Sequence, residues 1–359
     1  MLQVVNHTPF VASLSVFPDP TGVETAYMVV KATFSFDAHG VELAAKQAQL
    51  LAADVFWGEP VSSSIRAVGE FALSKPSTDV LLVGHAVAPD PGTHVADVSL
   101  RVGPVARCIR VFGDRVWQKR GGQWRPSDPQ PWERMPLRWE LAWGGVCAAQ
   151  GDEVPDHEPR NPVGRGLVAN KSQPADLQPL PNLEDPAALL SRPQDRPAPV
   201  CFAPIAPTWQ PRRSHAGTYD EAWVTGRAPY LPLDFDPRYF QVAPSGLISP
   251  AWLEGDEAVE LIGFHGGSMQ FDLPACGLDL VADFDGKKTP LEPRLEMVLV
   301  EPDVGRLQLL WRAALTVDKK LLKLKDVTVR SRVYARDGSR AAPLGQMSGG
   351  LPSAYAEAV

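Results

Sequence analysis

The amino-acid sequence predicts a mainly β protein of sandwich-like antiparallel sheets, with few short helices and long loops rich in proline and glycine. The first and last thirds contain runs in which apolar and polar residues alternate, as in strands with one buried face. Residues 151–250 hold 18 of the 36 prolines. Proline cannot donate a backbone hydrogen bond, so this stretch is excluded from regular helices and interior strands. Its tryptophans, tyrosines and leucines favour an ordered loop over a disordered linker.

The first third is expected to form several strands. Residues 26–36 alternate between apolar side chains and a second set that includes lysine and threonine, and residues 95–102 repeat the pattern. Residues 78–87 contain a more continuous apolar run. Residues 106–117 are predicted to form a strand pair around a Gly-Asp turn at 113–114, because both residue types tolerate the backbone angles of turns.

The last third is expected to add further strands. Residues 295–300 and 307–315 flank a Pro-Asp-Val-Gly sequence, which predicts a hairpin. Residues 326–334 are predicted to form the final strand, at the edge of a sheet, with arginines on the solvent side. Such an edge is a candidate for accepting a strand from a partner protein, since backbone hydrogen bonds would provide affinity.

Helices are expected to be few and short. The Asp-Pro pair at 185–186 resembles an N-cap and a first-turn proline for a helix over 186–191. The Ser-Pro pair at 249–250 would open a single turn that Gly255 closes. Residues 41–51 fit either a strand or a helix.

These elements divide the chain into four regions. Residues 1–145 form an N-terminal β region, and residues 146–250 form a wrapped loop region rich in proline, glycine and tryptophan. Residues 251–338 form a C-terminal β region. The tail at 339–359 has no periodicity and is predicted to be flexible.

Composition and charge argue against several functional classes. The chain has 359 residues, 44% apolar content and a formal net charge of −7, whereas a nucleic-acid-binding domain normally presents a basic face. No window reaches the ~18 continuous apolar residues of a membrane-spanning helix, and the N-terminus lacks the features of a secretory signal. We therefore expect a cytoplasmic protein that binds neither nucleic acid nor membrane.

No cofactor or metal ion is predicted. The glycine pairs at 144–145 and 266–267 lack the spacing of phosphate-binding loops. The seven histidines do not fall at metal-ligand spacing. The four cysteines are scattered without a C-x-x-C pair and are expected to be reduced and mostly buried; they are Cys108, Cys147, Cys201 and Cys276.

Recognisable catalytic motifs are absent as well, which favours a protein that is not an enzyme. The alternative is a carbohydrate-active hydrolase, because a glycosidase needs two carboxyl groups about 5–10 Å apart and aromatic platforms for sugars. Under the competing interpretation, the same acidic side chains serve turns, where they hydrogen-bond to local backbone. The four carboxylates concerned are Asp234, Asp236, Asp256 and Glu257.

A cluster of aromatic residues and arginines in the proline-rich region is the predicted partner-binding surface. Tryptophan, tyrosine and arginine are the residue types that dominate interface energetics. Packing within the wrapped loop is the alternative for any one of them. The cluster comprises Trp209, Arg212, Arg213, Tyr219 and Trp223.

Short motifs spread along almost the whole chain resemble the bacterial domain-of-unknown-function family 2169. Each motif is short, and their number and order carry the resemblance. The main ones are Asn6 with Thr8-Pro9-Phe10, Lys31-Ala32-Thr33-Phe34, Asp54 with Trp57-Gly58, Lys75-Pro76 with Thr78-Asp79, Gly84-His85-Ala86, Gly113-Asp114-Arg115 with Trp117, Met135-Pro136-Leu137, Gly144-Gly145, Asn161-Pro162 with Gly164-Arg165-Gly166, Leu180-Pro181-Asn182, Gly217-Thr218-Tyr219-Asp220, Asp234-Phe235-Asp236, Ala243-Pro244, Gly255-Asp256-Glu257 and Trp311-Arg312.

The resemblance implies an association with type VI secretion, the contractile injection machine of Gram-negative bacteria. Similar proteins are thought to be cytoplasmic adaptors or chaperones that load an effector carrying a PAAR-type tip domain onto the VgrG spike. The resemblance implies no catalytic residues. A structural component that travels with the spike is a further alternative.

Overall fold

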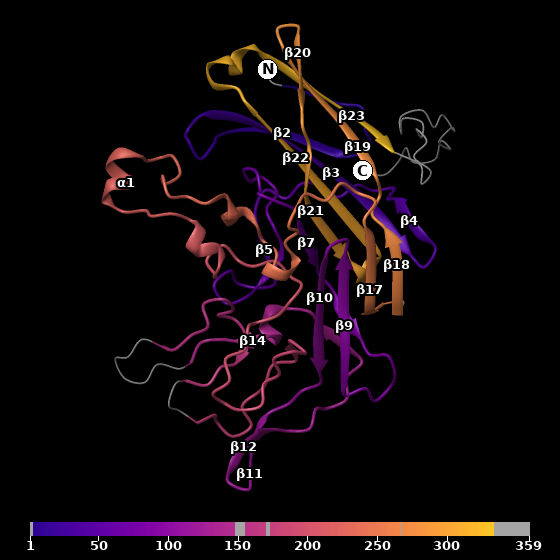
Figure 1. The fold of residues 1–359 in the computed structure, drawn as a ribbon, viewed down its shortest axis with the longest axis vertical. Helices are drawn as coiled ribbons and strands as arrows, with labels where there is room; N and C mark the ends of the chain where they lie inside the picture. Colours follow the sequence, from indigo (N-terminus) through magenta and orange to yellow (C-terminus); the bar gives the residue numbers. More distant parts are fainter. Residues whose placement is uncertain (1–2, 148–154, 170–172, 266, 334–359) are drawn as a thin grey trace, which may run out of the picture.

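The computed structural model describes residues 3–147, 155–169, 173–265 and 267–333 (Figure 1). Most regular structure in these ranges is β, and antiparallel pairing dominates the sheets, which confirms the predicted fold class. The predicted flexible tail at 339–359 lies outside the described residues. Within the described ranges, every helix is too short or too polar to cross a lipid bilayer.

The largest sheet combines strands from the first and last thirds of the chain. Its order is β2-β3-β22-β21-β7, with β4 paired to β3, and all pairs except β21–β7 are antiparallel. The alternating run at 26–36 lies in β3, and the predicted hairpin is β21–β22. The strands are β2 Val11–Pro18, β3 Glu24–Asp37, β4 Gly40–Leu43, β7 Asp79–Leu82, β21 Arg294–Glu301 and β22 Arg306–Thr316.

Two further sheets complete the main β structure. One has the order β16-β10-β9-β17-β18, and the other has the order β1-β23-β19-β20. The strands of the first are β9 Val95–Val102, β10 Val105–Phe112, β16 Leu183–Glu184, β17 Ala258–Phe264 and β18 Gly267–Asp272. Those of the second are β1 Gln3–Asn6, β19 Cys276–Phe284, β20 Lys287–Leu291 and β23 Leu324–Val333.

The remaining elements are short. Two-stranded sheets pair β5 Val55–Phe56 with β6 Ile65–Ala67, β8 His85–Val87 with β13 Arg134–Pro136, β11 Trp117–Arg120 with β12 Gln123–Pro126, and β14 Trp143–Gly144 with β15 Arg165–Gly166. The helices are α1 Glu221–Gly226 and the 3₁₀ turns η1 Trp139–Leu141, η2 Arg212–His215, η3 Pro237–Phe240, η4 Ser245–Leu247, η5 Pro302–Val304 and η6 Asp318–Lys323.

Both faces of the six-stranded sheet are buried, although the pattern of β3 predicts only one buried face. The apolar face contributes side chains such as Phe34 and Leu309 to the main hydrophobic core. The other face carries polar and charged side chains, including Lys31 and Gln308, that are also almost inaccessible to solvent. Coil segments cover this second face: the Nζ atom of Lys31 donates to the backbone oxygen of Gln49 at 3.1 Å.

Four local predictions are wrong. Residues 106–117 do not form a strand pair, because β10 pairs with β9 and β16 while β11 pairs with β12. The predicted edge strand at 326–334 is interior in its described part, since β23 pairs with β19 on one side and, over residues 326–329, with β1 on the other. Residues 186–191 form turns instead of a helix, and the expected turn after 249–250 is replaced by η4 just before it. Residues 41–51 begin as β4 and continue as coil.

Asn161, in the proline-rich region, packs tightly against the segment around Gly144 that precedes this region. The side-chain nitrogen of Asn161 donates to the backbone oxygens of Trp139 (2.8 Å) and Trp143 (2.9 Å). Gly144 has a φ of +145°, and a Cβ atom there would lie 2.3 Å from the backbone oxygen of Asn161. Only glycine fits this position, because a side chain would be strained and would clash with backbone. The Asn161 and Gly144 motifs therefore have a structural role.

Gly144→Ala is expected to lower the free energy of unfolding by about 3 kcal/mol, because strain at positive φ adds to the steric clash. Urea unfolding followed by tryptophan fluorescence measures this change. Gly40→Ala is the matched control for the positive φ: its φ is +142°, and nothing lies within 4 Å of the added Cβ. A Gly144→Ala variant no less stable than Gly40→Ala would contradict the role of close packing.

Candidate partner-binding site

Residues 213–238, here called the arm, carry α1 and extend away from the sheets (Figure 1). The base of the arm is formed by η2 and by the chain that returns through η3. These two 3₁₀ turns contact each other, so the arm leaves and rejoins the body at one place. The predicted partner-binding residues lie partly in this base and partly on the arm itself.

Trp209 fixes the base of the arm in the main hydrophobic core. Its side chain is 4% exposed, and its ring meets Trp139 edge-on, with 6.2 Å between ring centroids. The indole nitrogen of Trp139 donates to the backbone oxygens of Ala203 (3.1 Å) and Pro204 (2.9 Å). The two tryptophans therefore join η1 to the start of the arm.

Arg212 is the second buried anchor, with 7% of the residue exposed. Its guanidinium donates through Nε to the backbone oxygen of Tyr239 at 3.0 Å and through Nη1 to that of Ile205 at 2.6 Å. The guanidinium also lies 5.2 Å from the centroid of the Tyr239 ring. Burial lowers the pKa of Arg212. These contacts tie the outgoing and returning chains of the arm to the body.

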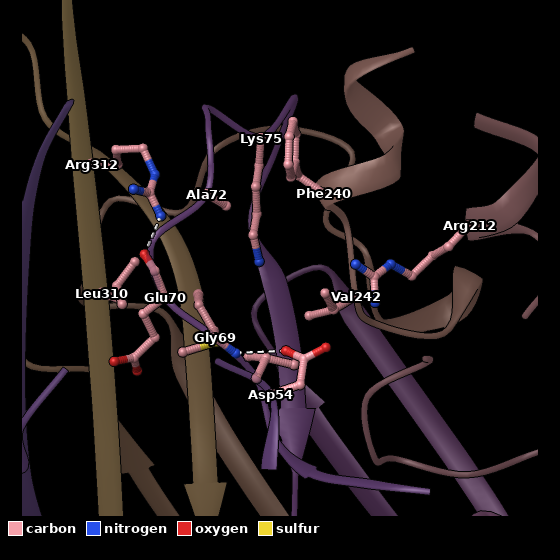
Figure 2. A pocket seen from close by; sticks show the side chains of 12 residues that line it. Asp54, Gly69, Glu70, Ala72, Lys75, Arg212, Phe240, Val242, Leu310 and Arg312 are labelled. Atoms are coloured by element: carbon pink, nitrogen blue, oxygen red, sulfur yellow. Dashed lines mark hydrogen bonds between the residues drawn. The ribbon is translucent and has the colours of Figure 1, made fainter. Parts of the chain in front are cut away.

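A small cavity of about 40 Å³ separates this anchor from the charged face of the six-stranded sheet. Figure 2 shows Lys75 and Arg212 pointing into the space between the sheet and its cover, with Arg312 beside Glu70. The volume is sufficient for a few water molecules.

Three buried charged residues that line this cavity, Glu70, Lys75 and Arg312, pair with three others. We call the six the buried charge layer, defined as Lys31, Glu70, Lys75, Asp79, Glu296 and Arg312. They make three ion pairs: Lys31–Glu70 at 2.7 Å, Lys75–Asp79 at 2.6 Å and Arg312–Glu296 at 2.7 Å. The same carboxylates accept backbone hydrogen bonds, for example from the N–H of Val242 to Asp79 at 2.8 Å. Buried charges are tolerated only when they are paired in this way. The buried charge layer therefore holds the coil segments that cover this face, and with them the base of the arm, against the sheet.

The arm is itself held by side-chain hydrogen bonds. Asp220 caps α1 by accepting from the N–H of Trp223 at 2.9 Å. Asp234 accepts from the N–H and the hydroxyl of Thr218, at 3.0 and 2.7 Å. Arg227 donates to the backbone oxygens of Leu231 and of Pro20, the latter in the loop between β2 and β3. A surface braced in this way loses little entropy when it binds a partner.

The outer surface of the arm carries large apolar side chains that contact solvent. Tyr219 is 53% exposed, Val224 60%, Tyr230 40% and Leu233 87%. Trp223 packs against the Tyr219 ring, with centroids 4.7 Å apart, and its indole nitrogen donates to the Tyr230 backbone oxygen at 2.8 Å. We call Tyr219, Val224, Tyr230 and Leu233 the apolar arm residues.

The five predicted binding residues thus occupy two environments. Trp209 and Arg212 are buried in the base, whereas Arg213 and Tyr219 are exposed and Trp223 is half-buried. The sequence prediction missed three of the apolar arm residues, Val224, Tyr230 and Leu233. The sequence offered one signal that these residues are exposed: they are large apolar residues in a stretch without strand or helix periodicity.

Three of the four carboxylates considered for hydrolysis, Asp234, Asp236 and Glu257, are engaged in local structure. Hydrogen bonds from Thr218 lower the pKa of Asp234, and the hydrogen bond from Arg238 lowers that of Asp236. Glu257 accepts from the N–H groups of Glu254 and Gly255. A glycosidase general acid needs a raised pKa, so the environments of Asp234 and Asp236 do not suit that role.

Other chemically reactive groups give no further candidate. Cys201 and Cys276 are buried, and burial raises the pKa of each thiol to about 12. Cys108 is exposed and Cys147 is half-buried; burial raises the pKa of both thiols as well. All four cysteines are free thiols. Most were expected to be buried, but only two of the four are. Among the described residues, no group of three or more His, Cys, Asp or Glu side chains could hold a metal ion.

Comparison with known proteins assigns a family. Residues 21–312 match the family model described as "Uncharacterized protein conserved in bacteria (DUF2169)". The chain belongs to this family. No curated protein and no solved structure matches the chain. The arm, its base and the buried charge layer all lie within the part of the chain that the family model covers.

Proposed function

We propose that this member of the DUF2169 family is a non-catalytic cytoplasmic adaptor that holds a PAAR-containing effector of the type VI secretion machine for loading onto VgrG. The observation that carries the proposal is the set of apolar arm residues on a braced, projecting arm. Exposed large apolar side chains are a feature of protein-binding sites, and four of them lie within residues 219–233.

The type VI assignment rests on the motif resemblance, and the binding mode rests on the physical chemistry of the arm. An adaptor has to hold its partner and later release it. A small number of exposed aromatic and aliphatic side chains suits this task, since a few residues supply most of the binding energy at an interface. Their fixed backbone lowers the entropic cost of association.

Co-expression with the nearest encoded PAAR-containing effector tests the proposal. The double variant Val224→Ser/Leu233→Ser is expected to weaken effector binding at least about tenfold, because two exposed apolar contacts are lost. Both side chains are mainly exposed, so the variant is expected to fold. Leu322→Ser is the matched control, since Leu322 is 98% exposed and lies in η6, outside the arm.

Other outcomes separate the alternatives. If the wild-type protein fails to retain the effector at micromolar concentration, the adaptor proposal is wrong. Detection of the protein in secreted material together with the spike would favour a structural spike component. Hydrolysis in a broad glycan screen that Asp234→Ala or Glu257→Ala abolishes would favour the hydrolase instead.

A further inference from the structure

A second cavity, of about 480 Å³, lies on the charged face of the six-stranded sheet near the Arg306 end of β22. The base of the arm packs near the opposite end of the same strand, where Arg238 and Phe240 line a separate cavity with Thr316. We call the cavity of about 480 Å³ at the Arg306 end of β22 the Trp57 cleft. Its floor is formed by Met297, Leu299 and Gln308. Its volume is in the range of small-ligand sites.

Three carboxylates line the Trp57 cleft, and each already has a cationic or hydrogen-bonding partner. Glu70 pairs with Lys31 at 2.7 Å, and Glu301 pairs with Arg306. Asp303 binds Nδ1 of His85 at 2.7 Å and Nη2 of Arg134 at 3.0 Å. The carboxylates of the cleft are therefore fully engaged within the protein.

Two arginines at Trp57 lack such a partner among the described residues, and one of them, Arg66, lines the cleft. The guanidinium carbon of Arg138 lies 3.5 Å from the centroid of the Trp57 ring, and that of Arg66 lies 5.8 Å from it. Among the described residues, neither arginine forms an ion pair, and Nε of Arg138 is buried with no hydrogen-bond partner. Of the two arginines that line the cleft, Arg66 and Arg306, only Arg66 lacks a carboxylate partner among the described residues, in a chain whose net charge is −7.

The loop of the β5–β6 hairpin holds this arrangement in place. The hairpin carries both Trp57 and Arg66, and its Ser64 donates through N–H and hydroxyl to the Glu140 carboxylate at 2.7 and 2.8 Å. Glu140 lies two residues after Arg138. The tryptophan and the two arginines therefore come from two segments that are directly tied to each other, which pre-organises them for a ligand.

We propose that the Trp57 cleft binds the carboxylate of an acidic side chain in an acidic–apolar peptide segment of the partner protein. Arginine recognises carboxylates with paired hydrogen bonds, and the apolar floor accepts a neighbouring aliphatic side chain. A phosphate would bring a second negative charge close to Glu301 and Asp303, so a single carboxylate fits the cleft better. The choice of a peptide rests on the proposed adaptor function.

Titration calorimetry with two synthetic peptides tests this inference on the full-length protein. One is acetyl-Leu-Glu-Leu-Glu-Leu-amide, and the other has glutamine in place of both glutamates. The glutamate peptide is expected to bind at least about tenfold more tightly, and Arg66→Glu is expected to remove this difference. Arg66 is exposed, so the variant is expected to fold. Arg125→Glu, an exposed arginine on β12 that does not line the cleft, is expected to bind as the wild type does.

Equal affinity for the two peptides, or unchanged binding by Arg66→Glu, would overturn the inference. Free glutarate that binds as tightly as the glutamate peptide would overturn the choice of a peptide and indicate a site for small acids. The test is separate from that of the arm. Effector capture that depends on Val224 and Leu233 but is unaffected by Arg66→Glu would leave the adaptor proposal intact and remove the cleft from it.

Discussion

Arg312→Ala is expected to lower the free energy of unfolding by about 3–5 kcal/mol, because it leaves Glu296 as an uncompensated buried charge. Both side chains are almost inaccessible, at 2% and 1% exposure, and their atoms are 2.7 Å apart. The guanidinium also donates to the backbone oxygen of Glu70 at 2.9 Å, so its loss leaves a second buried acceptor unpaired. Urea unfolding monitored by circular dichroism measures the effect.

The double variant Arg312→Met/Glu296→Met separates charge from packing. Replacing a buried ion pair with apolar residues of similar volume is often neutral or stabilising, so the double variant is expected to recover most of the stability lost by Arg312→Ala. A double variant as unstable as the single one would show that the hydrogen bonds of the pair to backbone matter more than its charge balance.

Trp209→Ala is expected to cost about 3–5 kcal/mol of stability, the range for removal of a buried large aromatic side chain. The contact with Trp139 is lost, and a cavity opens between η1 and the base of the arm. Trp223→Ala is the control. Trp223 lies on the arm, outside the buried core, so its substitution is expected to lower the free energy of unfolding much less. Equal losses of unfolding free energy for the two variants would contradict the division between buried base and exposed arm.

Local periodicity predicted the strands well, because alternation depends only on neighbouring residues. It could not predict that both faces of β3 are buried, since the cover over Lys31 comes from distant coil segments such as that of Gln49. The signal in the sequence was a lysine in the middle of a long, largely apolar strand. The prediction that β23 lies at the edge of a sheet was wrong for the same reason. Its partner β1 comes from the opposite end of the chain, and that pairing turns a predicted edge into an interior strand.

The candidate site was predictable by region but not by residue. Composition located tryptophan, tyrosine and arginine in the proline-rich stretch, yet Trp209 and Trp223 are the same residue type in different environments. Their difference depends on Trp139 and on the return of the chain at Tyr239, which are long-range contacts. The Trp57 cleft was not predicted, because Arg138 reaches the hairpin of Trp57 and Arg66 through long-range contacts such as the bond between Ser64 and Glu140.

The central claim is that the arm holds the effector, and amide hydrogen exchange of the purified complex tests it most directly. We expect slower exchange in residues 219–233 when the effector is bound, with unchanged exchange in the β11–β12 hairpin, which lies far from the arm (Figure 1). Slower exchange confined to other segments, with the arm unchanged in the complex, would contradict the claim.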